Sequence, residues 1–293
     1  MIKYLRESFV GLRYYIFKFI YPYPKILNIF ETLDFVLASN KSIARYGDGE
    51  FHMLGMSEDL GFQKIDHNLS NRLTEILSSD QKNCIIALPG GINNINGFNK
   101  VASYFWKQFY VFHYPKYYKL LDHTKVYCNA SFTRPYIDFK DRSLVGDYFL
   151  KMKKLWENKK ILIVEGEFSK LGVGNDLFEK AIAISRIVTL SKNAFDHYEE
   201  IFEKTKLVAA DYDLILVALG PTATVLAYDM SQLGYRTLDI GHIDVEYEWY
   251  INKAETKIAI NGKQVNENSY DIMENENFLD KKYHNQIIFT IKN

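Results

Sequence analysis

Hydrophobic and polar positions alternate along most of this chain in patterns typical of strands and helices. From about residue 84, short apolar runs are separated by amphipathic segments whose apolar residues recur at helical spacing. The runs that we predict as strands are 84–88, 125–129, 161–165, 187–190, 214–219 and 237–240. The segments that we predict as helices are 99–112, 143–156, 176–185, 194–204 and 222–233, with Asn175 as N-cap of the third and Gly234 just beyond the last.

This alternation predicts an α/β fold. Strands that alternate with helices imply βαβ crossovers, hence a mostly parallel, Rossmann-like sheet with helices on both faces. Ligands of such sheets bind outside the carboxyl ends of the strands. Polar or glycine-rich segments follow the predicted strands at 89–91, 129–135, 165–167, 220–222 and 241–242, so we expect one rim of the sheet to carry the site.

The two ends of the chain are expected to lie outside this alternation. The segment 1–25 is rich in tyrosine, phenylalanine, lysine and arginine and contains one acid, Glu7. It predicts a helix that either packs on the domain or rests on an anionic membrane surface. Residues 257–265 predict a hairpin with an Asn-Gly turn, and 287–291 a final strand. The expected division is a basic aromatic segment at 1–40, a domain at 41–252 and a peripheral tail at 253–293 packed on the same domain.

Composition and charge exclude several classes of protein. Of 293 residues, 47% are hydrophobic and 25% charged, a normal globular balance. Lys plus Arg and Asp plus Glu number 36 each, so no overall field attracts nucleic acid. Apolar runs are too short for a membrane span, and the N-terminus lacks a signal peptide pattern. Cys84 and Cys128 lie in apolar runs and are expected as free thiols in a reducing cytoplasm, with the inner face of the membrane as an open alternative.

An acidic pair stands where one short apolar run ends. The run 42–46 leads to Asp48 and Glu50, each preceded by a glycine. In extended backbone, residues two apart project from the same face, so Asp48 and Glu50 would point at one spot. Two carboxylates that close repel each other unless a cation lies between them, which predicts a Mn²⁺ or Mg²⁺ site. The alternative is ordinary Gly-Asp-Gly turn chemistry with Glu50 in solvent.

Other rim positions are candidates for binding a phosphate-bearing ligand. A predicted strand runs through Gly220 into a helix, which leaves backbone N–H groups and a positive dipole end for phosphate, although a plain β-α turn fits equally well. The segment 172–176 is a second glycine-rich approach to a predicted helix. The predicted ligand-binding residues are Arg45, Gly47, Arg134, Glu165, Gly166, Asn175, Gly220, Pro221 and Thr222.

The run 241–249 is dense in functional side chains and has two interpretations. If it is extended, it places its polar side chains on one face, where they supply a metal ligand and a general base. If it is helical, it pairs Asp244 with Glu248, and acidic residues at a helix start complement the helix dipole. The polar residues concerned are His242, Asp244, Glu246 and Glu248.

Taken in order, the motifs of this chain resemble a known family. They are RYGDGE, TRPYIDF, ILIVEGE, GVGNDLF, SKNAF, LVALGPTATVLAYD and GHIDVEYEW, spread over about residues 40 to 252. Together they strongly resemble a bacterial glycosyltransferase family of the GT-D fold, first catalogued as a domain of unknown function. The resemblance implies metal-dependent transfer of a sugar from a nucleotide diphosphate donor, with Asp48 and Glu50 at the metal and the diphosphate. It also implies acceptors among bacterial glycans, such as surface polysaccharides, glycoproteins or lipid-linked chains.

The mechanism expected from this resemblance is leaving-group stabilisation. Mn²⁺ or Mg²⁺ on Asp48 and Glu50, with His242 as a further ligand, would offset charge on the departing nucleotide of a UDP-sugar such as UDP-glucose. One carboxylate among Asp244, Glu246 and Glu248, with Glu246 preferred, would deprotonate the acceptor hydroxyl, which implies inversion. The alternatives are a nucleotide-sugar or phosphomonoester phosphohydrolase and a non-catalytic nucleotide-sugar binding module, and a homodimer stays open.

Overall fold

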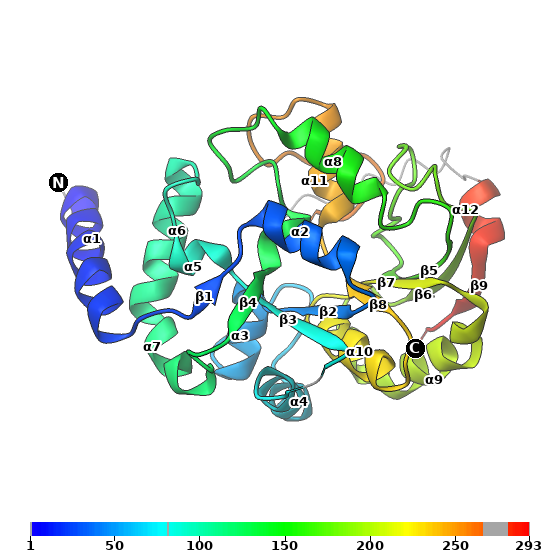
Figure 1. The fold of residues 1–293 in the computed structure, drawn as a ribbon, viewed down its shortest axis with the longest axis horizontal. Coiled ribbons are helices and arrows are strands. Elements are labelled where there is room, and N and C mark those ends of the chain that lie inside the picture. Colours follow the sequence, from blue (N-terminus) through cyan, green and yellow to red (C-terminus); the bar gives the residue numbers. More distant parts are fainter. Residues whose placement is uncertain (1, 81, 266–280, 293) are drawn as a thin grey trace.

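A parallel β-sheet is the centre of the molecule. The computed structural model describes residues 2–80, 82–265 and 281–292 of the chain. Within these residues the strands form one nine-stranded sheet in the order β1-β4-β3-β2-β8-β7-β5-β6-β9, with every neighbouring pair parallel (Figure 1). The strands are β1 (Lys25–Ile26), β2 (Ser42–Arg45), β3 (Cys84–Leu88), β4 (Val126–Asn129), β5 (Lys160–Gly166), β6 (Ala183–Thr189), β7 (Leu214–Ala218), β8 (Thr237–Asp239) and β9 (Ile287–Thr290).

Helices cover both faces of this sheet. In Figure 1, α2, α8 and α11 lie above it, and α4, α9 and α10 below it. The α-helices are α1 (Ile2–Ile20), α2 (Ile29–Ala38), α3 (Asp48–Leu54), α4 (His67–Leu77), α5 (Gly90–Asn93), α6 (Lys100–Phe112), α7 (Tyr114–Tyr117), α8 (Val145–Lys153), α9 (Tyr198–Val208), α10 (Pro221–Gln232), α11 (Ile243–Ile251) and α12 (Lys281–Gln286). Short 3₁₀ helices at Tyr118–Leu120, Ala130–Thr133, Ala194–His197 and Ala209–Asp211 complete the described elements. The predicted α/β fold is therefore confirmed.

The side chains of β5 divide between two of the three hydrophobic clusters of the described residues. In β5, Ile161 and Ile163 join the cluster that includes residues of α2, α8 and α11, whereas Leu162 and Val164 join the cluster with residues of α9 and α10. Successive side chains of a strand point to opposite faces, so a strand covered on both sides reads as a continuous apolar run. This is why the run at 161–165 could be recognised in the sequence as a strand.

One predicted helix is wrong. Residues 176–182 form turns, and β6 begins at Ala183, inside the segment 176–185 that we expected to be helical. The segment forms a strand and not a helix because β6 pairs with the whole of β5, from Lys160 opposite Ala183 to Gly166 opposite Thr189. Asn175 is consequently no helix cap.

The two ends of the chain pack more closely on the domain than a peripheral segment would. Gly262 has the left-handed φ of +72° expected of the Asn-Gly turn, but the predicted hairpin is reduced to an isolated bridge between Ile260 and Lys263. The last strand, β9, extends the main sheet by pairing in parallel with β6. At the other end, α1 packs against α6 (Figure 1). Among the described residues, no helix combines the length and the apolar character that crossing a bilayer requires.

Candidate functional site

A cavity of about 500 Å³ opens at the carboxyl ends of the strands. Segments that end or follow β2 to β8 all contribute to its wall, which confirms the expectation of a single rim. The rim residues among its lining are Arg45, Gly47, Asp48, Glu50, Pro89, Ala130, Ser131, Gly166, Leu190, Ser191, Ala218, Leu219, Gly220, Gly241 and His242.

The acidic pair lies at this cavity, but in a helix rather than a strand. α3 begins at Asp48, with Gly47 as its N-cap, so the extended backbone that we expected over 48–50 is wrong. The side chain of Glu50 turns back to the start of the helix, where its Oε2 accepts a hydrogen bond of 2.6 Å from the Gly47 N–H. Both carboxylates still line the cavity, because the first turn of α3 forms part of its wall.

An ion pair that the sequence analysis missed lies beneath this turn. Arg45 at the end of β2 donates from Nη2 to Oδ1 of Asp239 over 2.7 Å and from Nε to the Asp239 carbonyl over 2.9 Å. Asp239 ends β8 and is 2% exposed. The strands are neighbours in the sheet, with Ile43 opposite Leu238, so the parallel register brings the two residues together. Only the position of Asp239 at a strand end could have drawn attention to it.

Glu50 has an unusual electrostatic environment. Burial and the negative charge of Asp239 raise the pKa of Glu50 to about 7, although the Gly47 N–H and Arg45 oppose this shift. Burial also raises the pKa of Asp239, against the effect of Arg45. A bound cation would lower the pKa of Glu50 and favour its charged form.

The glycine turn before α10 also reaches the cavity. Gly220 has φ +55° and ψ −140° and is the N-cap of α10, and a Cβ on it would come within 2.5 Å of the Phe62 ring. Its backbone lines the cavity, as expected. Pro221 and Thr222 are buried behind it and do not line the cavity, because the helix turns inward toward β2. Thr224, further along α10, donates a hydrogen bond to the carbonyl of Arg45 in β2.

Three charged side chains line the cavity from other segments: Arg134, Asp138 and Lys257. Lys257 Nζ lies 3.4 Å from Asp138 Oδ1, and Arg134 Nη2 lies 4.0 Å from Asp138 Oδ2. Of these, the sequence analysis selected only Arg134. Asp138 belongs to the motif TRPYIDF, whose spacing alone did not indicate that its acid faces a ligand.

Glu246, the preferred base, is fully buried and does not line the cavity. Its Oε2 accepts hydrogen bonds from the backbone N–H groups of Tyr136 and Ile137 over 2.9 and 3.1 Å, and its Oε1 lies 3.7 Å from Arg134 Nε. Burial raises the pKa of Glu246 to about 7, with Arg134 opposing the shift. The contacts assign Glu246 to holding the segment that carries Arg134 and Asp138.

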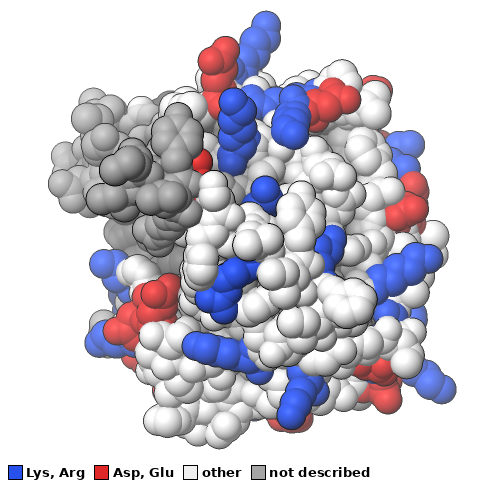
Figure 2. All heavy atoms as spheres, turned by 90° about the vertical axis from the view of Figure 1, so that its left-hand side faces the viewer, with Lys and Arg blue, Asp and Glu red and all other residues white. Residues whose placement is uncertain are grey.

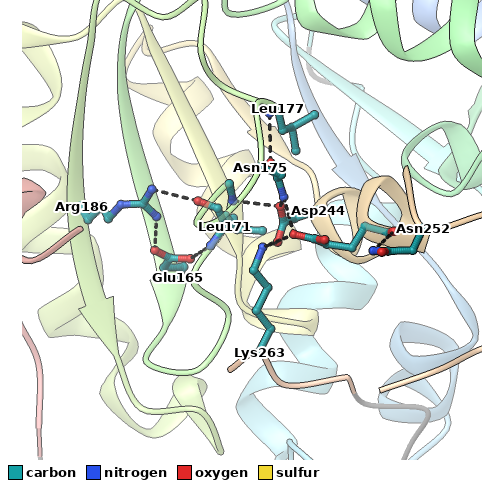
Figure 3. Close-up of polar contacts among 10 residues, drawn as sticks. Glu165, Leu171, Asn175, Leu177, Arg186, Asp244, Asn252 and Lys263 are labelled. Atoms are coloured by element: carbon teal, nitrogen blue, oxygen red, sulfur yellow. Dashed lines mark hydrogen bonds and ion pairs between the residues drawn. The ribbon is translucent and has the colours of Figure 1, made fainter. Parts of the chain in front are cut away.

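The other two candidates for the general base, Asp244 and Glu248, are hydrogen-bonded to side chains outside the cavity (Figure 3). α11 begins at Ile243 and takes up most of the run 241–249, so the extended interpretation is wrong, the helical one is confirmed, and Asp244 and Glu248 lie one turn apart. Between them Lys263 Nζ donates to Asp244 Oδ2 over 2.6 Å and to Glu248 Oε1 over 2.9 Å. Asn175 Nδ2 donates to both carboxylates over 2.8 and 2.7 Å. None of these four residues lines this cavity, so Asn175, which was predicted as a ligand-binding residue, lies away from it.

Glu165 is also structural. It is fully buried, its Oε1 accepts from Arg186 Nη1, and its Oε2 accepts from the Leu171 N–H over 2.7 Å (Figure 3). Burial raises its pKa, and Arg186 opposes this. Its neighbour Gly166, the last residue of β5, does line the cavity.

The three residues predicted as metal ligands are not gathered into one group. His242 lines the cavity at the start of α11. However, no group of three or more His, Cys, Asp or Glu side chains suited to a metal occurs among the residues that the structure describes. His242 is therefore not brought together with Asp48 and Glu50 as a third ligand.

An aromatic wall completes the cavity. Phe98, Phe105 and Trp106 line it from α6 and the turn before it, and none of them was singled out in the sequence. Aromatic rings suit the faces of sugars and bases. The helix itself was predicted, but its sequence does not say which of its faces meets a ligand.

Comparisons with known proteins agree with this architecture. The sequence profile of the family described as "Glycosyltransferase GT-D fold" matches residues 43–268. The chain is 38% identical over 270 residues to Glycosyltransferase GlyD of Streptococcus pneumoniae and 39% identical over 264 residues to the probable glycosyl transferase Gly of Streptococcus gordonii. These alignments cover 92% and 90% of this chain, but only 33% and 38% of the relatives, so the chain spans about a third of their length.

A solved structure is similar over nearly the whole chain. It is described as domain of unknown function 1792 with a distinct glycosyltransferase fold, and it is 36% identical with a TM-score of 0.85. The match covers 92% of this chain and 96% of that one. The chain belongs to the glycosyltransferase family of the GT-D fold.

Proposed function

We propose that this chain transfers a sugar from a nucleoside diphosphate sugar, with UDP-sugars such as UDP-glucose as first candidates, to a hydroxyl of a bacterial glycan. One observation carries the proposal: Asp48 and Glu50 share a cavity at the strand ends with Arg45, Arg134 and Lys257. Its volume of about 500 Å³ lies within the range of small-molecule sites. A nucleoside diphosphate is bound by carboxylates that hold its cation and by basic side chains that contact its phosphates.

The residues present fit Mn²⁺ or Mg²⁺. Mg²⁺ is usually held by one or two protein carboxylates together with substrate phosphates, so a pair of ligands is enough when the donor is bound. The pKa of Glu50 is raised first by burial and then by the negative charge of Asp239, and a cation beside this carboxylate would offset both effects. When bound by Asp48 and Glu50, the cation supplies positive charge to the departing diphosphate.

The side chains of the cavity would hold the donor. Lys257 and Arg134 supply cations, and the start of α10 at Gly220 supplies the positive end of a helix dipole. Arg45 is held by Asp239, so its guanidinium is oriented before the donor arrives. The rings of Phe98, Phe105 and Trp106 would stack on the sugar or the base.

Asp138 replaces Glu246 as the proposed general base. Among the described residues, the carboxylates that line the cavity are Asp48, Glu50 and Asp138, and the first two are assigned to the cation. Asp138 lies beside Lys257 and Arg134, and its carboxylate faces the cavity, where it can accept the proton of an acceptor hydroxyl. A base that activates the acceptor directly implies inversion at the anomeric carbon.

The test is sugar transfer by the full chain with a panel of UDP- and GDP-sugars, Mn²⁺ and glycan acceptors. Asp48→Asn, Glu50→Gln and Asp138→Asn are each expected to reduce transfer about 10²-fold or more, since each removes charge from the reacting site. Glu200→Gln, an exposed change on α9, is the matched control.

Two results would contradict the proposal. Transfer by Asp48→Asn and Glu50→Gln at the rate of the wild type would remove these residues from the site. Release of the nucleotide without any dependence on an acceptor would instead identify a phosphohydrolase, and donor binding without turnover a binding module.

A further inference from the structure

The outer side of α1 is an exposed apolar surface. Six large apolar side chains of this helix are exposed, among them Phe19 at 91%, Tyr15 at 68% and Leu12 at 66%. The others are Phe9, Ile16 and Ile20. Their spacing of three and four residues places them on one side of the helix, which we call the α1 outer face. An apolar surface of this size on a folded protein usually marks an interaction site.

The opposite side of α1 is anchored in the protein. Val10 and Tyr14 are buried against α6, where the Tyr14 and Tyr110 rings meet edge to face at 5.3 Å. Lys18 Nζ donates to the Asn93 carbonyl over 2.9 Å. Because one side is already packed, the outer face stays exposed when the helix is folded, and its exposure does not reflect a detached segment.

The segments that form this end of the molecule are rich in positive charge. Residues 1–25 and 100–120, which include the packed helices α1 and α6, contain nine basic residues and one acid, Glu7, in a chain whose charges balance at 36 each. The basic residues are Lys3, Arg6, Arg13, Lys18, Lys25, Lys100, Lys107, Lys116 and Lys119. Figure 2, which views this end of the molecule, shows Lys and Arg among uncharged atoms with Asp and Glu mostly toward the margin.

The positive charge of this end of the molecule indicates which kind of partner would cover the α1 outer face. A second copy of the chain in a symmetric dimer would place the same basic patch against itself, where like charges repel. Nucleic acid needs the charges within the contact, whereas here the contact itself is apolar and the charges flank it. An anionic bilayer satisfies both features, since its acyl boundary takes apolar side chains and its headgroups take lysine and arginine.

We propose that the α1 outer face docks this protein on an anionic membrane surface, with Phe19, Ile16 and Leu12 inserted at the headgroup boundary and the lysines of α6, α7 and the 3₁₀ helix Tyr118–Leu120 contacting phosphate headgroups. The cavity would then lie near the bilayer. α6 packs on α1, and its residues Val101, Phe105 and Trp106 line the cavity, so about one helix diameter, roughly 10 Å, separates the two. The proposal concerns lipid binding and does not rest on the proposed transfer.

The experiment is co-sedimentation of the full chain with vesicles of phosphatidylglycerol and phosphatidylcholine, compared with phosphatidylcholine alone. The wild type is expected to bind the anionic vesicles and to be released by salt. The triple change Leu12→Ser, Ile16→Ser, Phe19→Ser is expected to weaken binding about tenfold or more. The matched control is Leu150→Ser, Ile182→Ser, Leu207→Ser, which alters equally exposed apolar residues elsewhere and should bind as the wild type does.

A second pair of variants tests the charge. Lys116→Glu with Lys119→Glu should weaken binding to anionic vesicles several-fold, while Lys154→Glu with Lys192→Glu should not. Circular dichroism checks that the outer-face variant is folded. The proposal is overturned if the wild type does not bind anionic vesicles, or if the outer-face variant binds them as well as the wild type does. It is also overturned if vesicle binding is absent and sedimentation velocity shows that the wild type is a dimer and the outer-face variant a monomer.

Discussion

Two acidic clusters in this molecule have similar residues and different neutralising groups. On α11, Asp244 and Glu248 enclose the ammonium of Lys263, so the chain provides its own cation. At the cavity, Asp48 and Glu50 lie beside Arg45, whose guanidinium is already bound to Asp239. The first cluster holds the tail of the domain against α11. The second keeps excess negative charge at a surface that a ligand can reach, which is the property expected of a site for an external cation.

We expect the largest effect on stability when the ammonium of Lys263 is removed. Lys263→Met leaves Asp244 and Glu248 buried side by side without their ammonium, which should lower the free energy of unfolding by about 3–5 kcal/mol. Urea denaturation measures this. Lys192→Met, an exposed change, should stay within about 0.5 kcal/mol. If Lys263→Met is as stable as its control, the tail does not hold α11. Adding Asp244→Asn to the Lys263→Met variant should restore part of the loss, since it relieves the repulsion.

An intermediate effect concerns Glu246, which is buried with neither a lysine nor solvent at its carboxylate. Its folded pKa of about 7 lies above the ordinary value of 4.5. Its contribution to stability is therefore fully present below about pH 4.5 and is lost as pH rises to 7, because the folded state must then release a proton that it binds more tightly than the unfolded state. The decrease should be at most about 3 kcal/mol. Denaturation curves at several pH values should show a flatter profile for Glu246→Gln, and an unchanged profile would contradict the assignment.

The smallest effect is expected at Glu50. Glu50→Gln keeps an acceptor for the Gly47 N–H and removes a charge that Asp239 repels, so the free energy of unfolding should change by less than about 1 kcal/mol or increase. The measurement is the same urea titration without metal. A loss as large as that of Lys263→Met would mean that Glu50 is as fully neutralised by the protein as the α11 cluster, and the contrast between the two clusters would disappear.

Much of the fold could be predicted because the decisive pattern is local. Buried parallel strands such as 84–88 and 214–219 are continuous apolar runs, and helices such as α6 and α10 keep helical spacing and have recognisable ends. The prediction fails at 176–185, where pairing with β5 determines a strand, and at 48–50, where α3 begins in place of extended backbone. At 241–249 the sequence left a strand and a helix start open, and the structure has the helix. Backbone conformation at strand ends depends on the neighbouring segments that pack there, which local spacing does not reveal.

By itself the sequence determined the α/β class, the rim at the strand ends and the place of Asp48 and Glu50 at that rim, because side-chain periodicity and the order of motifs are properties of the chain. Only the tertiary structure decided which carboxylates face the cavity. Lys263 neutralises Asp244 and Glu248, and Arg45 joins Asp239 from a neighbouring strand, through contacts between residues far apart in sequence. The charge state and accessibility of an acid depend on these partners, and residue spacing carries no information about them.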